Sequence, residues 1–183
     1  MEPLELVDRL AAARIGDTFN QYADSELLRE RLRGYLGERA DAPLLLVGEA
    51  AGYRGARISG IPFTSQRQLT GAGPAEATAT IVHRTLMELG LENDVMLWNV
   101  VPTHPGTARS NRRPTRAEVT AAAPFLATLA QNRRTIAVGR LAAETTGAPY
   151  VRHPSHGGAR AFRAGLAAAT IRRRRTRVRR IYA

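Results

Sequence analysis

Three polar side chains of different chemistry stand at or near the ends of short apolar runs in the sequence: Glu49, Asn99 and His153. A carboxylate such as Glu49 can activate water or stabilise a developing cation. The Asn99 amide can read a planar edge that offers both a donor and an acceptor, and the His153 imidazole can donate to oxygen on a departing group. Brought together, the three side chains could hydrolyse a bond to a planar leaving group.

The elements that must position these residues alternate between short β-rich runs and longer helical stretches. We predict a single α/β domain with a central parallel four-stranded sheet flanked by helices on both faces. Its strands are expected at residues 43–48, 95–101, 135–139 and 149–152. Helices are expected at residues 4–13, 24–36 with Asp24 as N-cap, 75–89, 115–129 with a Thr115/Glu118 capping box, 140–146, and from about 159. Ligands of such sheets bind beyond the carboxyl ends of the strands, where the three polar residues fall.

A glycine-rich, irregular stretch is predicted from residue 50 to about residue 73, after the first strand, and a polar loop is predicted at residues 103–114. Residues 48–60 contain Gly48, Gly52, Gly55 and Gly60, and Phe63 comes just after them. Glycines allow backbone N–H groups to approach a ligand closely, and Phe63 is a candidate stacking platform at the pocket edge.

Each candidate also has a plainer structural explanation. Glu49 could cap the following turn, Asn99 could be a satisfied buried amide, and His153 before a proline could belong to a structured turn. Phe63 could belong to the core, as we expect for Trp98.

Charge is distributed unevenly along the chain, whose net charge is +11 and whose 27 basic residues are all arginine. Residues 1–94 hold 10 arginines and 14 acids, whereas residues 95–183 hold 17 arginines and two acids. A GC-rich genome would explain arginine in place of lysine but not the scarcity of acids in the second half. The asymmetry predicts a polyanionic partner such as nucleic acid. We expect the domain to span residues 1–171 and an arginine-rich tail, including Arg172 and Arg173, to span residues 172–183.

Composition excludes several classes of protein. With no cysteine, the chain alone forms no disulfide, thiolate zinc site or cysteine-ligated iron–sulfur cluster. No apolar run approaches the roughly 20 residues of a membrane helix, and the acidic first 20 residues do not resemble a signal peptide. The four histidines share no metal-ligand spacing. We therefore expect a cytoplasmic monomer without metal or cofactor.

Four motifs occur in order at or near the ends of the predicted strands: Gly48-Glu-Ala-Ala-Gly52, Gly60-Ile-Pro-Phe63, Trp98-Asn-Val-Val101 and His153-Pro-Ser155. In this order they resemble the uracil-DNA glycosylase superfamily, above all the branch with Gly-Glu-Ala-Pro-Gly and His-Pro-Ser motifs. The likeness covers about residues 44–166.

The resemblance implies hydrolysis of the N-glycosidic bond of uracil, or a related deaminated base, flipped out of DNA. It implies catalytic roles for Glu49 at the water or the sugar cation and for His153 at the uracil oxygen. Phe63 would stack on the base, Asn99 would read its Watson–Crick edge, and Gly48 and Tyr53 would complete the base pocket. DNA contacts would come from Ser155, Gly157, Gly158, Arg109, Arg112 and Arg113, together with the tail arginines Arg172 and Arg173.

The sequence departs from the family pattern at several points, among them the absence of the four cysteines with which some relatives bind an iron–sulfur cluster. Ala51 replaces a proline, residues 53–57 lack the second acid that relatives carry as water activator, and His156-Gly157-Gly158 stands where relatives carry an apolar wedge. His104 lies in the loop where one relative uses a histidine to bond covalently to DNA, but the surrounding motif differs.

These departures leave two alternatives to a metal-free DNA glycosylase. One is a catalytically weak or inactive nucleic-acid-binding member of the same superfamily. The other is an enzyme or binder of free nucleosides or nucleotides that uses the same base pocket.

Overall fold

A parallel sheet organises the chain. The computed structural model describes the backbone of residues 3–181 and the side chains of residues 5–170. Strands β1 (Leu44–Ala50), β2 (Val95–Val101), β5 (Arg134–Val138) and β6 (Tyr150–Val151) form one sheet in the order β2-β1-β5-β6. All of its strand pairs are parallel, which confirms the predicted four-stranded parallel sheet.

Side chains of the central strand β1 alternate between two apolar layers. Leu45 and Val47 enter one core cluster, whereas Leu44 and Leu46 enter the other. Because both faces of the strand are buried, its sequence is a continuous apolar run, as is usual for parallel sheets.

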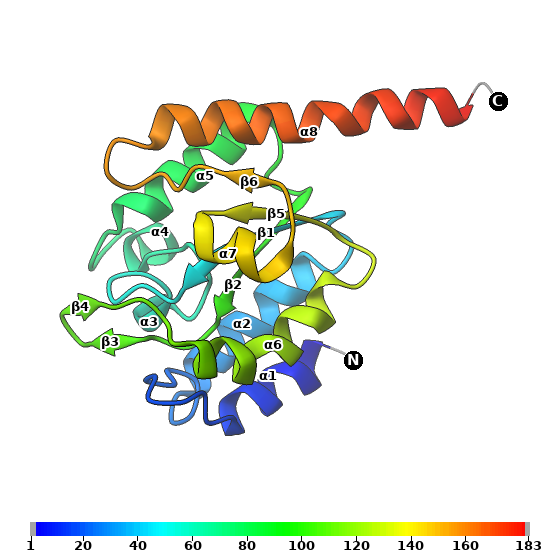
Figure 1. Cartoon of the computed structure of the whole chain (residues 1–183). Helices are drawn as coiled ribbons and strands as arrows, with labels where there is room; N and C mark the ends of the chain where they lie inside the picture. Colours follow the sequence, from blue (N-terminus) through cyan, green and yellow to red (C-terminus); the bar gives the residue numbers. More distant parts are fainter. Residues whose placement is uncertain (1–2, 182–183) are drawn as a thin grey trace.

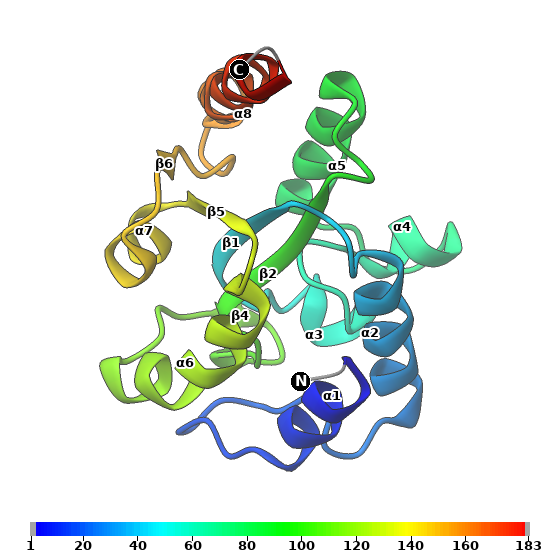
Figure 2. The same ribbon diagram turned by 90° about the vertical axis from the view of Figure 1, so that its right-hand side faces the viewer.

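Helices cover both faces of the sheet, as predicted (Figures 1 and 2). The cluster that contains Leu45 and Val47 includes side chains of four helices: α1 (Pro3–Ala12), α2 (Glu26–Glu38), α6 (Arg116–Ala130) and α7 (Arg140–Thr146). The opposite cluster includes side chains of α5 (Ala77–Leu89) and α8 (Ala159–Ile181).

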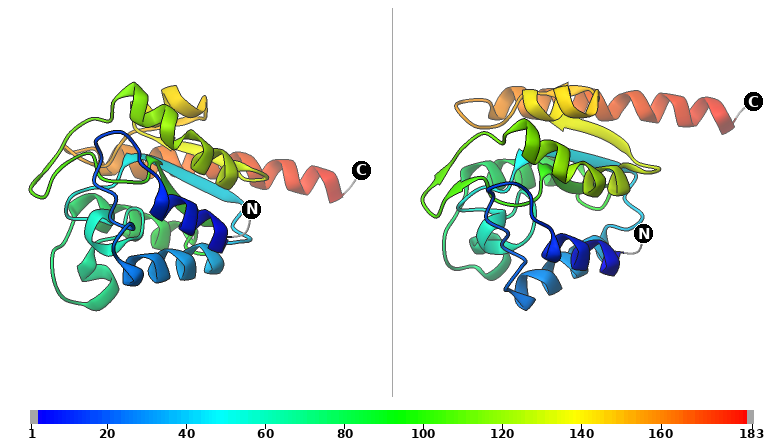
Figure 3. Two further views of the ribbon diagram at one scale, coloured as in Figure 1. Left: turned by 90° about the horizontal axis from the view of Figure 1, so that it is seen from below. Right: turned by 60° about the horizontal axis from the view of Figure 1, so that its bottom comes forward.

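Helix α8 continues as a helix across the predicted domain boundary at residues 171 and 172. Its first half contributes Phe162 and Leu166 to the core, and its second half extends beyond the other elements (Figures 1 and 3). The predicted tail arginines Arg172 and Arg173 lie outside the side chains that the structure describes.

Several local predictions were wrong in detail. Ser25, not Asp24, is the N-cap of α2, and its hydroxyl accepts a hydrogen bond from the Leu28 amide. The stretch expected to be irregular contains the short helices α3 (Ala56–Ser59) and α4 (Gln66–Thr70), and the polar loop after β2 forms a hairpin of β3 (Gly106–Thr107) and β4 (Ser110–Asn111). The predicted capping box of Thr115 and Glu118 at α6 is confirmed.

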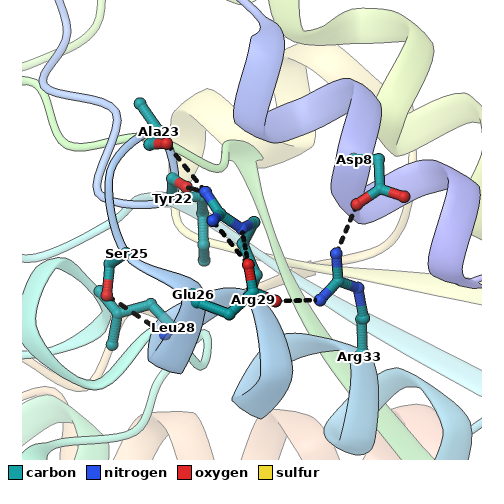
Figure 4. Close-up of polar contacts among 8 residues, drawn as sticks. All are labelled: Asp8, Tyr22, Ala23, Ser25, Glu26, Leu28, Arg29 and Arg33. Atoms are coloured by element: carbon teal, nitrogen blue, oxygen red, sulfur yellow. Dashed lines mark hydrogen bonds and ion pairs between the residues drawn. The ribbon is translucent and has the colours of Figure 1, made fainter.

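Polar contacts join α1, α2 and the segment between them (Figure 4). Arg33 pairs with Asp8 of α1 and with Glu26, and Arg29 donates to Glu26 and to the carbonyls of two residues before α2. The acidic partners are more than half exposed, so these pairs fix geometry more than they add stability.

A buried carboxylate, Glu118, ties α6 to the β3–β4 hairpin. Only 1% of the residue is exposed. Its two oxygens accept hydrogen bonds from the Arg112 guanidinium, at 2.8 and 2.5 Å, and one also accepts from the Thr115 amide at 2.8 Å. The Arg112 guanidinium above all, together with the backbone donors of Thr115 and Asp17, lowers the pKa of Glu118 to about 2.

Replacing Glu118 by glutamine should therefore destabilise the fold. We expect Glu118→Gln to lower the free energy of unfolding in urea by about 3 kcal/mol at pH 7, since it breaks a buried ion pair. The matched control is Glu144→Gln, which removes an exposed pair with Arg113 and should change the free energy by less than about 0.5 kcal/mol. Equal stabilities of the two variants would contradict this role.

The same pair predicts a pH dependence. Because folding lowers the Glu118 pKa, the carboxylate contributes its full stability above its ordinary pKa of 4.5 and loses it as the pH falls toward about 2. The stability difference between wild type and Glu118→Gln should shrink across that window. A difference that stays constant from pH 7 to pH 2 would refute the assignment.

Candidate active site

A cavity of about 630 Å³ opens at the carboxyl ends of the strands. Its lining includes six of the residues predicted from the sequence: Glu49, Phe63, Asn99, Arg112, His153 and Ser155. The chain passes from β1 to β2 on one side of β1 and later to β5 on the other, so the sheet has its topological switch point there. Ligands of open parallel sheets bind at such a point.

Gly48 makes room for two of these residues. It pairs in register with Asn99 of β2. A Cβ atom on Gly48 would lie 2.3 Å from the Phe63 ring and 2.8 Å from Asn99 Oδ1. Glycine is therefore required here for close approach, and Gly48 lies beneath the cavity rather than in its lining.

Phe63 is held in an unusual backbone conformation, with φ of +53°. Its ring packs in the α5–α8 core and also lines the cavity, so Phe63 belongs to the core and to the edge of the pocket. The neighbouring Thr64 is fixed by the Ser59 hydroxyl, which donates to its carbonyl, and by a 3.0 Å hydrogen bond between its hydroxyl and His83. A left-handed phenylalanine costs energy, and these contacts hold it in place.

The Asn99 amide is buried, with 3% of the residue exposed, yet no hydrogen bond joins its side chain to any other described residue. Buried amides in proteins are normally paired. An unpaired amide in the lining of a cavity is thus available to a ligand, which favours a binding role over the structural alternative.

His153 follows the edge strand β6 and is oriented by its own turn. The Ser155 amide donates to His153 Nδ1 at 3.2 Å, and the Ser155 hydroxyl lies 2.8 Å from the same atom. Burial above all, with the charge of Arg152, lowers the His153 pKa, so the ring is neutral near pH 7. With Nδ1 accepting, the proton of the neutral ring resides on Nε2, which is left free to donate.

Two carboxylates, Glu49 and Glu76, line the cavity. Neither has a hydrogen bond or ion pair among the described side chains, so Glu49 does not cap the following turn. Burial raises the pKa of both, and for Glu49 the charge of Arg113 acts in the opposite direction. The glycines at positions 52 and 55, which we expected to admit a ligand, leave room for the Glu76 side chain, and Gly52 also lines the cavity.

Tyr53 does not line the cavity, contrary to prediction. The turn after β1 is bound to the hairpin, because the Tyr53 amide donates to Asn111 Oδ1 at 2.9 Å, and the Tyr53 ring lies under the Arg54 guanidinium.

The predicted DNA-binding arginines 109, 112 and 113 lie in or directly after the hairpin. Arg112 lines the cavity, but its guanidinium is paired with Glu118. Arg113 is exposed and pairs with Glu144 at 3.3 Å, and Arg109 is exposed in the hairpin turn.

The two glycines after Ser155 differ in environment. Gly157 is exposed, with φ of +74° and open space around it. Gly158 is buried, its amide donates to the Ser155 carbonyl at 3.0 Å, and an added Cβ would lie 2.1 Å from the His153 carbonyl oxygen. The predicted phosphate contact of the Gly158 amide therefore does not fit, since that amide already supports the His153 turn.

Sequence reasoning missed several lining residues. Arg140 and Arg152 stand just after strands β5 and β6, so the rule that found Glu49 could have found them. Tyr150 and Asn111 lie in strands β6 and β4, whereas Glu76 and Thr78 come from the start of α5, where no strand end marked them.

His104 is fully buried, and its two ring nitrogens lie 2.7 and 2.8 Å from the carbonyl oxygens of Ala51 and Thr107. It joins the turn after β1 to the hairpin, and this position is unsuited to a covalent bond with DNA.

Within the described residues, no group of three or more histidine, aspartate and glutamate side chains is arranged to hold a metal ion. None of the described helices has both the length and the apolar character needed to cross a membrane.

Comparisons with known proteins agree with this architecture. The structure is similar to the crystal structure of wild-type Pedobacter heparinus SMUG2, with a TM-score of 0.68 and 11% sequence identity over 96% of this chain and 99% of that chain. No curated protein matches the sequence. A model described as the Uracil DNA glycosylase superfamily matches residues 35–176, most of the chain. This protein therefore belongs to the uracil DNA glycosylase superfamily.

Proposed function

We propose that the protein is a monofunctional DNA glycosylase that hydrolyses the N-glycosidic bond of uracil, or a related deaminated base, flipped out of DNA. The observation that carries this proposal is the convergence of Glu49, Phe63, Asn99 and His153 on one cavity at the switch point of the sheet. Its volume of about 630 Å³ falls within the roughly 300–1,000 Å³ usual for small-ligand sites, enough for a flipped nucleotide.

Base recognition is assigned to Phe63 and Asn99. The Phe63 ring supplies a flat apolar surface on which a base can stack. Next to it, the unpaired Asn99 amide offers one acceptor and two donors, which match the adjacent N–H and carbonyl groups of uracil. Gly48 keeps the two side chains close enough to act on one base.

Departure of the base is assigned to His153. Cleavage leaves negative charge on the base oxygens, and a donor already aimed at that charge stabilises the transition state. The turn that fixes Nδ1 as an acceptor leaves the Nε2 proton for this purpose. Glu49, at the end of β1, is assigned to the positive charge that develops on the sugar.

DNA binding is assigned to positive groups around the cavity and in the second half of the chain. Arg140 and Arg152 line the cavity, and Arg109 and Arg113 are exposed near it. Ser155 and the amide of the exposed Gly157 remain candidates for a phosphate contact. A polymeric polyanion fits this arrangement better than a free nucleoside does.

The decisive experiment is an excision assay on duplex and single-stranded oligonucleotides that each contain one uracil, hypoxanthine or xanthine. Alkali-labile cleavage at the lesion is the expected outcome. Binding without an abasic product would favour the inactive nucleic-acid-binding alternative. Turnover of free nucleosides alone would favour an enzyme that acts on free nucleosides or nucleotides.

Removing the base-reading or leaving-group side chain should abolish most activity. We expect Asn99→Ala and His153→Ala each to lower the single-turnover excision rate by about 100- to 1000-fold, because each removes a transition-state hydrogen bond. The control is Asn93→Ala, at an exposed asparagine before β2. An unchanged rate in either cavity variant, with the fold intact by circular dichroism, would remove that residue from the proposal.

The close approach at Gly48 gives a steric test. In Gly48→Ala the new Cβ would displace Phe63 and Asn99, and a shift of about 1 Å at an active site can cost about 100-fold in rate. Gly34→Ala is the control because nothing lies within 4 Å of the new Cβ on α2. Equal excision rates for the two variants would show that the contact does not matter for activity.

The tail arginines are assigned to phosphate contacts, which salt dependence can test. Arg172→Gln with Arg173→Gln should reduce the slope of log affinity against log salt by up to about 1.8, since each phosphate contact contributes about 0.9 on duplex DNA. Arg14→Gln, in the acidic half and exposed, should leave the slope unchanged. If the double variant keeps the wild-type slope, these arginines do not bind phosphate.

A further inference from the structure

A second acidic side chain enters the cavity from a position that is not at the end of a strand. Glu76 precedes α5 and lines the same cavity as Glu49, Asn99 and His153. It occupies the N-cap position of α5, but its side chain makes no capping hydrogen bond. Capping, the usual reason for a polar side chain at that position, therefore does not explain its placement.

The Glu76 carboxylate lies in the space beside two glycines, which we call its seat. A Cβ atom on Gly52 would lie 2.3 Å from Glu76 Oε1, and a Cβ atom on Gly55 would lie 2.0 Å from Oε2. Neither glycine has a positive φ. Their lack of a side chain brings the carboxylate against the turn that follows Glu49.

No described group of the protein pairs with this carboxylate. Among the described residues no hydrogen bond or ion pair joins its oxygens, although Arg112, Arg140 and Arg152 line the same cavity. The contrast is with Glu118, whose oxygens are occupied by Arg112 and a backbone amide. Because a half-buried carboxylate without partners is costly, its lone pairs are suited to water or to a ligand in the cavity.

We propose that Glu76 is the catalytic residue that orients and deprotonates the attacking water, an inference that rests on the function proposed above. In the reaction the bond between C1′ and the base nitrogen breaks, and its electron pair leaves with the base. The water oxygen forms a new bond to C1′, and Glu76 accepts the water proton, which is afterwards released to the base. The products are the free base and an abasic sugar with a hydroxyl at C1′.

The two cavity acids differ in a way that supports this division of roles. The positive charge of Arg113 favours the ionised form of Glu49, which suits it to face a sugar cation. Burial raises the pKa of Glu76 with no nearby positive charge acting against it, which suits this carboxylate to accept a proton. The chain thus obtains from the start of α5 the second acid that residues 53–57 lack.

The test compares Glu76→Gln with Glu38→Gln, a control at an exposed acid of α2. Glutamine keeps the shape of the side chain but is not a base. We expect Glu76→Gln to lower the single-turnover excision rate by at least about 100-fold, the lower range for general base catalysis, while affinity for an oligonucleotide with a non-cleavable uracil analogue stays at the wild-type value. In Glu76→Ala, azide should restore part of the rate, since it attacks C1′ without needing a base.

A double-mutant cycle tests the position of the carboxylate. Gly55→Ala should lower the excision rate in the wild-type background because its Cβ would displace Glu76. In the Glu76→Ala background the same substitution should have little further effect, since the clash is gone. Additive losses would mean that Gly55 acts independently of Glu76 and would overturn the proposed seat.

The outcomes separate this inference from the proposed function. If wild type excises a base and Glu76→Gln excises it at the same rate, the role of Glu76 is wrong and the glycosylase assignment stands. A Glu76→Gln variant that loses affinity rather than rate, or a Glu76→Ala variant that azide does not rescue, also overturns the role. If wild type excises no base at all, the proposed function fails and the role of Glu76 fails with it.

Discussion

The geometry of the cavity depends on one missing Cβ atom. At Gly48 the central strand has no side chain toward the cavity, and the Phe63 ring and the Asn99 amide fill that space together. Any larger residue would separate the aromatic surface from the polar group beside it. The left-handed backbone of Phe63, the Ser59 and His83 hydrogen bonds around Thr64 and the buried position of the ring all serve to keep that contact. Packing therefore sets the relative positions of the Phe63 ring and the Asn99 amide, and any chemistry at the cavity depends on those positions.

Three carboxylates of the protein fall into two kinds: one is paired and supports the fold, and two line the cavity with no described partner. Glu118 is fully occupied by its guanidinium and amide donors and therefore holds the hairpin against α6. Glu49 and Glu76 are kept without partners in a cavity, where burial works against their charge. A protein gains nothing in stability from the second arrangement, which is why unpaired acids in a cavity point to function.

The sheet, its parallel direction and most helices could be predicted from the sequence. Strands that are buried on both faces have continuous apolar sequences, and glycine and capping residues mark the helix ends. Gly90 and Gly147, for example, end α5 and α7 in the left-handed conformation. The site residues could be predicted where they stand at or near strand ends, as Glu49, Asn99 and His153 do.

Residues positioned by a turn rather than by a strand were not predictable in this way. Tyr53 was assigned to the pocket from its place in a motif, but a hydrogen bond to Asn111 fixes the turn with its side chain outside the cavity lining. Glu76 carries no signal in its own neighbourhood, since its position depends on two glycines more than 20 residues earlier. The free space beside a glycine appears only once the chain has folded.

The strand that leads to His153 is the shortest of the sheet and lies at its edge. β6 pairs with β5 through only two residue pairs, and it is covered by α8, the last helix described in the chain. The imidazole is oriented within its own turn by Ser155, but the strand before it is held in part by packing of Val151 against Phe162 and Leu166 of α8. During synthesis on the ribosome, a nascent chain would lack the part of this core cluster that Phe162 and Leu166 supply until α8 emerges, and β6 would be uncovered beside the cavity. The order of translation would thus delay completion of the cavity until α8 has been made.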